Sequence, residues 1–333
     1  MTITISLTCS IALLCAGVTG CADHDDEAGD PGALATQRDA VTASATLLVS
    51  GDFSSTSTTR TIVQSELATD PAAQLLAIGD LSYTAPYADN YPWLSWLSRT
   101  YPVMGNHEFN SVAGTGGQQP FDLFNGNNAA ANHTFPAITG NNGVATFDFA
   151  YSHEVTPGWL LVVLNTGTNC KQQACTQQAS RLTSWITSWR AAHAGKGCVI
   201  VALHTARWST MFSGDADNEP WAAGVAPIWS AAIADQADIV VQGHVHVYEE
   251  FQKLGASGQS SATGAKLFTV GAGGRGQVQP LQSNIAAAEL VASHGAPVNG
   301  VLKLALYSGS YGYKFETAAS SGSPPSSVAC NVP

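Results

Sequence analysis

The amino-acid sequence predicts one α/β domain, and three observations support this prediction. Short apolar runs alternate with helical patterns from residue 45 onward. Hydrophobic residues make up 45% of the 333 residues, which is enough to bury a large core. Most of the apolar runs are continuous rather than alternating in polarity, as expected of strands that are covered on both faces. The sequence shows no internal repeat and no linker that would separate a second domain.

The predicted elements follow one another along this region. In the clearest helix, residues 176–192, apolar side chains recur every three to four residues, so Trp185 and Trp189 are expected in the core. Residues 110–142 are rich in Gly, Asn and Ala and are expected to form a long irregular insertion near the functional site. The other helices are expected at 61–68 and 227–234, and the strands at 46–50, 74–78, 101–104, 160–165, 198–203, 238–242, 266–270 and 301–307.

The charge of the chain argues against two classes of partner. The chain carries 13 Lys and Arg against 24 Asp and Glu, which gives a formal net charge of −11. Binding to nucleic acid or to an anionic membrane surface depends on clustered cations, and the sequence contains no run of Lys or Arg. We therefore expect no nucleic-acid-binding surface, and membrane contact only through a lipid anchor.

The N-terminus has the pattern of an export signal. An apolar run ends in the sequence VTGC at residues 18–21, which resembles the lipobox of bacterial lipoproteins. We expect residues 1–20 to be a signal peptide, Cys21 to be acylated, and residues 21–44 to be a flexible acidic tether. The protein would then lie on a bacterial membrane, in the periplasm or at the cell surface. The alternative is an ordinary signal cleavage followed by secretion, and the mass of the mature N-terminus distinguishes the two.

Four of the seven cysteines lie beyond this signal, and an even number in an exported chain favours disulfides. Cys170 and Cys175 are close enough in sequence to clip one loop. Cys198 and Cys330 would then form the second pair by elimination. The alternative is that all four are buried free thiols.

Polar side chains that can bind metal directly follow five of the predicted strands. The segments read LLVSGD, LLAIGDLSY, YPVMGNHE, VIVALH and DIVVQGHVH. Ligands of α/β sheets bind beyond the carboxyl ends of the strands, so these side chains can converge there. Carboxylates, a phenol, an amide and imidazoles form a ligand set suited to Fe, Mn or Zn. The candidate residues are Asp52, Asp80, Tyr83, Asn106, His107, His204, His244 and His246.

Other polar or glycine-rich features receive simpler interpretations. His133, His153, His193 and His294 lie in polar or loop contexts and are expected on the surface. The glycine run VGAGGRG at residues 270–276 lacks the ending of a phosphate-binding P-loop. It is expected to form a tight turn after a strand and to line the cleft.

The ordered motifs GD, GDLSY, GNHE, a strand-end His and GHVHVYE resemble those of the calcineurin-like metallophosphoesterases, and among these the purple acid phosphatases. The Tyr three residues after Asp80 separates the purple acid phosphatases from most of their relatives. The resemblance covers residues 45–317, which would form the catalytic domain, with residues 318–333 as a C-terminal tail. It implies a four-layer α/β/β/α sandwich, in which helices flank two mixed β-sheets and a two-metal centre lies at the strand ends.

The resemblance also implies a role for each candidate residue. Asp80 would bridge the two metal ions, and His107 would contact the phosphate and protonate the leaving oxygen. The first metal, Fe(III), would be held by Asp52, Asp80, Tyr83 and His246, and the second, which is Fe(II), Zn or Mn, by Asp80, Asn106, His204 and His244.

The implied function is that of an acid phosphatase, a phosphoric monoester hydrolase that attacks a small phosphate ester with a metal-bound hydroxide. One alternative is a phosphodiesterase or nucleotide hydrolase with a Zn, Mn or Fe pair, and another is a surface lipoprotein that uses the fold only for binding. Three departures from the family pattern bear on substrate choice. They are GDFSS in place of GD-x-G at residues 51–55, the absence of Arg after Glu249, and the absence of His from the segment 208–221.

Overall fold

The structure is a computed structural model. It describes residues 43–54, 58–83, 94–110, 137–139, 145–147, 149–167, 170, 174–213, 218–276, 281–294, 299–318 and 327–331. The predicted signal peptide, Cys21, the tether up to residue 42, His133 and most of the predicted insertion lie outside the described residues.

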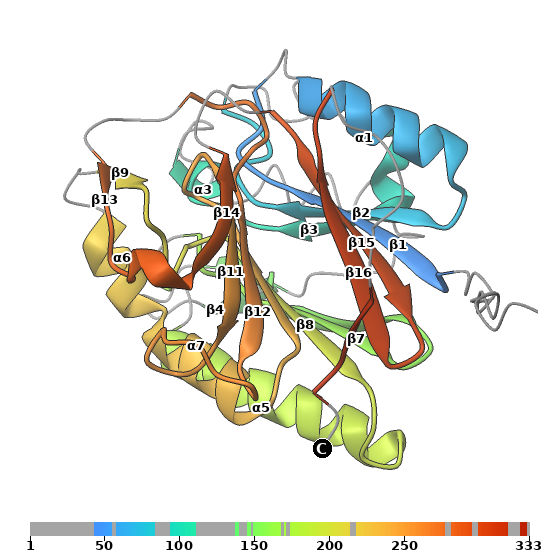
Figure 1. Ribbon diagram of the computed structural model, residues 1–333, viewed down its shortest axis with the longest axis vertical. Helices are drawn as coiled ribbons and strands as arrows, with labels where there is room; N and C mark the ends of the chain where they lie inside the picture. The colour runs from blue at the N-terminus through green and yellow to red at the C-terminus, as the bar shows by residue number, and fades with distance from the viewer. Residues whose placement is uncertain are drawn as a thin grey trace, which may run out of the picture. The chain divides into compact units, whose positions relative to one another are not determined.

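Two mixed sheets form the centre of the fold (Figure 1). The first has the strand order β17 (Ser327–Ala329), β16 (Ser310–Glu316), β15 (Val301–Tyr307), β1 (Ala45–Ser50), β2 (Ala73–Ile78), β3 (Thr100–Val103). In it, β1, β2 and β3 are parallel to one another, while β15 pairs with β1 in the antiparallel sense. The carboxyl ends of β1, β2 and β3 therefore lie at one edge.

The second sheet has a parallel centre and antiparallel margins. Its strand order is β14 (Leu290–His294), β11 (Tyr248–Leu254), β12 (Ala265–Val270), β10 (Ile239–Gln242), β8 (Cys198–Leu203), β7 (Trp159–Val163), β6 (Tyr151–Thr156). The four strands β12, β10, β8 and β7 are parallel. Two short pairs accompany the sheets, β4 (Ala137–Thr139) with β5 (Ala145–Phe147) and β9 (Phe212–Ser213) with β13 (Leu281–Gln282).

Helices cover the outer faces of both sheets, and the predicted fold is confirmed. The first sheet is covered by α1 (Thr58–Thr69) and the 3-10 helix η1 (Leu94–Arg99), and the second by α5 (Cys175–Ala192) and α7 (Ala226–Ala234). Shorter helices are α3 (His107–Asn110), α6 (Asn218–Gly224) and η2 (Ala287–Glu289). The facing sides of the sheets share one apolar cluster that includes Leu47, Leu76, Val163 and Ile200. Because each sheet is covered on both faces, its central strands are continuously apolar.

The predicted strands agree with the structure to within two residues at each end. On α5, Leu182 and Ile186 are fully buried, whereas Trp185 and Trp189 are only partly buried against the same cluster. The disulfide between Cys170 and Cys175 lies at the start of this helix.

The described C-terminal residues tie the two sheets together. β17 pairs with β16 in the first sheet. The next residue, Cys330, forms a disulfide with Cys198, the first residue of β8 in the second sheet. The backbone N–H of Asn331 then donates to the carboxylate of Asp238. We call residues 327–331 the C-terminal clasp; its strand is short, and the disulfide holds it in place.

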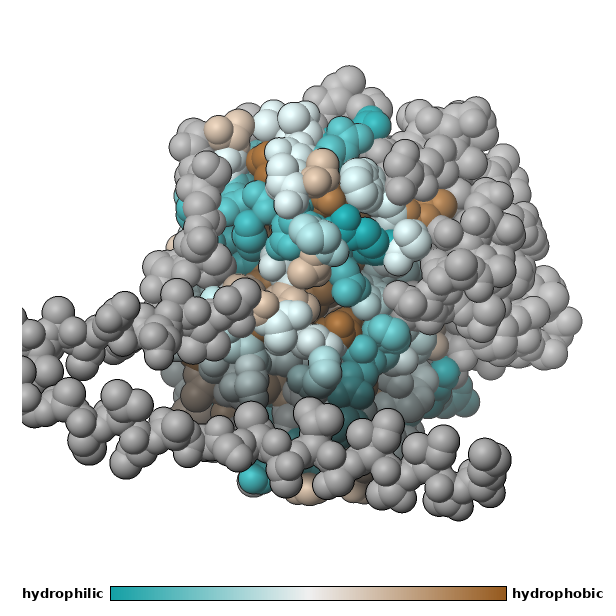
Figure 2. All heavy atoms as spheres, turned by 90° about the vertical axis from the view of Figure 1, so that its right-hand side faces the viewer, coloured by the Kyte–Doolittle hydropathy of each residue, from teal (hydrophilic) through white to brown (hydrophobic). Residues whose placement is uncertain are grey.

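No helix among the described residues combines the length and apolar character needed to cross a membrane. Figure 2 shows the face at the right-hand side of Figure 1, where the described surface is mainly hydrophilic and brown patches are small. Within the described part of the chain, Val291 is the one large hydrophobic side chain that is exposed. This face therefore offers no extended apolar patch among the described residues.

Candidate metal centre

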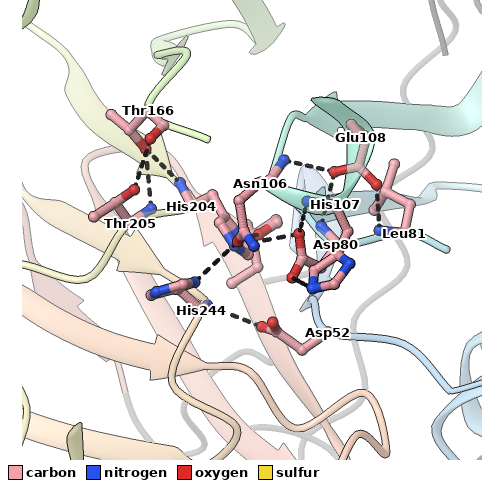
Figure 3. Close-up of polar contacts among 12 residues, drawn as sticks. Asp52, Asp80, Leu81, Asn106, His107, Glu108, Thr166, His204, Thr205 and His244 are labelled. Atoms are coloured by element: carbon pink, nitrogen blue, oxygen red, sulfur yellow. Dashed lines mark hydrogen bonds and ion pairs between the residues drawn. The ribbon is translucent and has the colours of Figure 1, made fainter. Parts of the chain in front are cut away.

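Loops at the carboxyl ends of five strands bring the predicted site residues together (Figure 3). Three loops follow β1, β2 and β3 of the first sheet, and two follow β8 and β10 of the second. Side chains from the two sheets lie in direct contact, as His204 Nε2 and Asn106 Oδ1 do at 3.1 Å. The residues that converge are Asp52, Asp80, Tyr83, Asn106, His107, His204, His244 and His246.

A first cluster of donor atoms consists of Asp52, Tyr83 and His246. The Tyr83 hydroxyl donates to Asp52 Oδ1 at 3.1 Å and lies 3.2 Å from His246 Nε2. His246 Nε2 is 3.4 Å from Asp52 Oδ1. His246 Nδ1 donates to the carbonyl oxygen of Gly276 at 2.7 Å, which fixes the tautomer and leaves the Nε2 lone pair directed at the cluster.

A second cluster is centred on Asn106. Its Oδ1 lies 3.1 Å from both His204 Nε2 and His244 Nδ1. His204 Nδ1 donates to the carbonyl oxygen of Ile78 at 2.9 Å, so its Nε2 presents a lone pair. The same Nε2 is 3.5 Å from Asp80 Oδ1, so Asp80 borders this cluster.

These contacts show that the residues fit a metal pair. Asp80, His204 and His244 each offer a ligand atom, and these atoms lie within 4.8 Å of one another. In the neutral form of His204, its Nε2 and Asn106 Oδ1 face each other as two acceptors in a buried place, which is unfavourable unless a cation lies between them. Asp80 also acts on the first cluster, because its negative charge helps to raise the pKa of Tyr83. A carboxylate shared by two donor clusters is what a dinuclear site requires.

The comparison with protein families decides the assignment. The family model described as calcineurin-like phosphoesterase matches residues 30–248. The chain belongs to the calcineurin-like phosphoesterase family. The resemblance predicted from the ordered motifs is thereby confirmed. Membership in this family implies a dinuclear metal centre, which the two donor clusters fit.

Solved structures share the fold of this chain. The purple acid phosphatase from yellow lupin (Lupinus luteus) seeds matches with a TM-score of 0.56 and 17% identity, over 85% of this chain and 53% of the lupin chain. This chain thus spans about half the length of the lupin enzyme. A dimetal phosphatase from Danio rerio matches with a TM-score of 0.51 and 14% identity, over 83% of this chain and 96% of the other. The comparison with curated proteins found no match.

The electrostatics of the candidate metal centre follow from burial and from its two aspartates. Burial raises the pKa of Asp52, but the hydrogen bond with His246 and the charges of the site histidines lower it to about 2. Burial lowers the pKa of His204 and of His246, and the aspartates outweigh it and raise both. Burial and the two aspartates raise the pKa of Tyr83 well above its usual value, whereas burial lowers the pKa of His107.

The backbone of the site is held in an unusual conformation. Asp52, Asp80 and His244 have φ angles of 60°, 49° and 69°. These lie in the left-handed region that residues other than glycine rarely adopt. Each such residue costs about 1–2 kcal/mol, so the surrounding structure must hold it in place. Gly105 permits the close approach, because a Cβ there would lie 2.2 Å from Asp80 Oδ1.

Glu108 is a positioning residue that the sequence analysis did not single out. Its buried carboxylate accepts backbone N–H groups from Gly105 at 2.6 Å, Leu81 at 2.8 Å and Asp80 at 2.9 Å. It thereby joins the loops that follow β2 and β3 (Figure 3). Burial and the neighbouring Asp80 raise the pKa of Glu108 to about 8. Its place directly after two candidate residues, in GNHE, is the signal that could have revealed it.

Thr166, which follows β7, holds the loop of His204 in the same way. Its hydroxyl oxygen accepts the backbone N–H of His204 at 3.1 Å and that of Thr205 at 2.9 Å. The Thr205 hydroxyl donates to the carbonyl oxygen of Thr166 at 2.7 Å. Both sides of the His204 loop are therefore fixed by hydrogen bonds.

The departures from the family pattern have physical counterparts in the structure. Without an Arg after Glu249, the buried Glu249 carboxylate accepts the Ser209 hydroxyl at 2.6 Å and the Thr210 N–H at 2.8 Å. In the segment that lacks a His, Trp221 stacks on His244 with ring centres 5.0 Å apart and an interplanar angle of 12°. Phe53, which follows Asp52, is buried.

The remaining histidines that the structure describes contact other regions. His193 pairs with Glu154 at 3.1 Å, His153 lies against Tyr101, and His294 is exposed. The glycine run follows β12 directly; its Gly274 forms a β-bridge with Phe53, and its last residue accepts the hydrogen bond of His246. The run is expected from the sequence to line the cleft, and the hydrogen bond from His246 to Gly276 places its last residue beside the site.

Proposed function

We propose that this protein is a phosphomonoesterase of purple acid phosphatase type that hydrolyses small phosphate esters with two metal ions. The observation that supports it is the pair of donor clusters on either side of Asp80, one of which contains the phenol of Tyr83. Two bound metal ions would neutralise the charge of the phosphate and acidify a water molecule.

The donor atoms favour different metals in the two clusters. Asp52, Asp80, Tyr83 and His246 offer mainly hard anionic oxygens, which suit Fe(III). The second cluster adds a neutral amide and two imidazoles to Asp80, which suits Fe(II), Zn or Mn. We therefore assign Asn106, His204 and His244 to the divalent ion.

His107 has the position of a proton donor to the leaving group. Its backbone N–H donates to Asp80 Oδ1 at 2.9 Å, whereas its Nε2 lies 3.9 Å from Asp80 Oδ2. The side chain is 31% exposed and packs against the ring of Tyr83, with ring centres 4.3 Å apart. It therefore borders the ligand set and can reach a bound ester from the solvent side, where a proton on the leaving oxygen is needed.

The test compares an aryl phosphate with a bis-aryl phosphate and measures the metal content of the active protein. We expect two metal ions per chain and a kcat/KM for the monoester that exceeds that for the diester. A preference for the diester, with a Zn or Mn pair, supports the phosphodiesterase alternative instead. Metal binding without hydrolysis of either ester supports the binding-only alternative.

Tyr83→Phe tests the metal in the first cluster. We expect the iron-loaded protein to show a visible phenolate-to-iron absorption band, and the variant to lose this band while its circular dichroism spectrum is retained. The reason is that Phe keeps the ring packed against His107 but removes the oxygen donor. If the iron-loaded wild-type protein has no such band, the assignment of Fe(III) is wrong.

A further inference from the structure

Arg275 lies at the edge of the candidate metal centre, in the glycine run that follows β12. Its backbone N–H donates to the carbonyl oxygen of Asp52 at 3.1 Å. The next residue, Gly276, accepts the hydrogen bond from His246 Nδ1 at 2.7 Å. The position of Arg275 is therefore fixed by the two loops that carry Asp52 and His246.

The side chain of Arg275 reaches over the ring of Tyr83. Its guanidinium carbon lies 4.4 Å from the ring centre, and the residue is exposed. The ring of His107 contacts the same ring of Tyr83. The charge of Arg275 also acts on His107, where it adds to the larger effect of burial in lowering the pKa. The guanidinium and the imidazole of His107, the proposed proton donor, therefore both contact the ring of Tyr83, whose hydroxyl belongs to the first donor cluster.

Arg275 has no anionic partner within the described part of the chain. No carboxylate there forms an ion pair with it, and its side chain makes no hydrogen bond there. Other described cations are engaged: Lys266 and Lys303 form ion pairs, and Arg99 and Arg190 donate to backbone carbonyls. An exposed guanidinium beside the site is therefore available to bind an oxyanion, with two parallel hydrogen bonds in its preferred geometry.

We propose that Arg275 determines specificity by binding a second oxyanionic group of the substrate, such as a carboxylate carried by the leaving group. This inference rests on the proposed function, because it takes the scissile phosphate to be held at the donor clusters and the leaving group to lie near His107. Arg275 and His107 both contact the ring of Tyr83, at the edge of the donor clusters. An ester with a charged leaving group then gains a contact that an uncharged one cannot make.

The test uses phenyl phosphate and 3-carboxyphenyl phosphate, whose phenols are similar leaving groups. We expect Arg275→Ala to raise the KM for 3-carboxyphenyl phosphate by about 10-fold or more and to change the KM for phenyl phosphate little. Arg275→Lys keeps the positive charge and loses the planar guanidinium. Its KM for 3-carboxyphenyl phosphate is therefore expected to lie between the values for the wild type and for Arg275→Ala. Arg181→Ala is the matched control, since Arg181 forms a similar cation–aromatic pair with Trp185 on the outer helix α5, at 4.5 Å.

Binding of two phosphonates that cannot be hydrolysed gives a readout without turnover. In calorimetry with the metal-loaded protein, 3-carboxyphenylphosphonate should bind more tightly than phenylphosphonate, and Arg275→Ala should abolish the difference. Equal effects of Arg275→Ala on both ligands, no effect on either, or no binding to the wild type would overturn the inference. If the two phosphonates differ in affinity and Arg275→Ala abolishes the difference, but no ester is hydrolysed, the proposed function is wrong. The role of Arg275 in binding a second oxyanionic group then still stands.

Discussion

A His107→Ala variant is expected to keep both metal ions and to lose about 10²–10⁴-fold of its activity on esters with poor leaving groups, the contribution typical of a general acid. The structure explains why the metals should stay. His107 touches Asp80 through its backbone N–H, which alanine retains, whereas its Nε2 is 3.9 Å from that carboxylate. Activated aryl esters need no proton on the leaving oxygen, so their rates should fall much less. Steady-state kinetics on a series of leaving groups, with metal analysis of each sample, measures both effects.

The matched comparison is His244→Ala. Its Nδ1 lies 3.1 Å from Asn106 Oδ1 inside the second cluster, so this variant should lose the second metal and its activity on every substrate alike. The proton-donor role of His107 is wrong if His107→Ala also strips metal, or if it slows activated and unactivated esters equally.

Removing the disulfide between Cys198 and Cys330 should lower the free energy of unfolding by about 5 kcal/mol, because the bond closes a loop with a sequence separation of 132 residues. A double change of both cysteines to alanine avoids leaving a free thiol. It should also weaken the C-terminal clasp, since Asn331 follows Cys330 directly. Urea unfolding followed by tryptophan fluorescence gives the free energy.

The disulfide between Cys170 and Cys175 provides the control for this prediction. Its separation is 5 residues, for which the same chain-entropy relation gives about 2 kcal/mol. Both double variants lose one disulfide, so a difference between their free energies of unfolding reports the effect of loop length and location. Equal losses of stability would contradict the idea that the clasp depends on its long closed loop.

The candidate site could be predicted from the sequence because each of its residues stands next to a strong local signal. Asp52, Asp80, Asn106 and His244 each follow a glycine at the end of an apolar strand, and His204 directly follows the end of another. The direction of these strands then determines that their loops meet. The central strands could be predicted for a related reason, since burial on both faces leaves a continuous apolar run.

Other parts of the structure depend on contacts between distant segments and leave no local pattern. β11 begins Tyr-Glu-Glu and appears polar in sequence, yet Glu249 is fully buried because Ser209 and Thr210 donate to it, and Glu250 pairs with Lys266. The same holds for Glu108, whose partners lie in two different loops. No periodicity in the sequence reports such pairings.

The position of β1 has a consequence for the order in which the protein is made and folds. Its antiparallel neighbour is β15, and the hydroxyl of Ser44 beside it donates to the carbonyl oxygen of Leu306, 262 residues later. The first sheet therefore cannot take up its native order until the ribosome has translated residues 301–307. Pairing over such sequence separations is slow. The apolar strand β1 therefore lacks its antiparallel partner β15 during most of synthesis. A nascent chain of this topology therefore keeps apolar strands exposed, and prone to aggregation, until its synthesis is nearly complete.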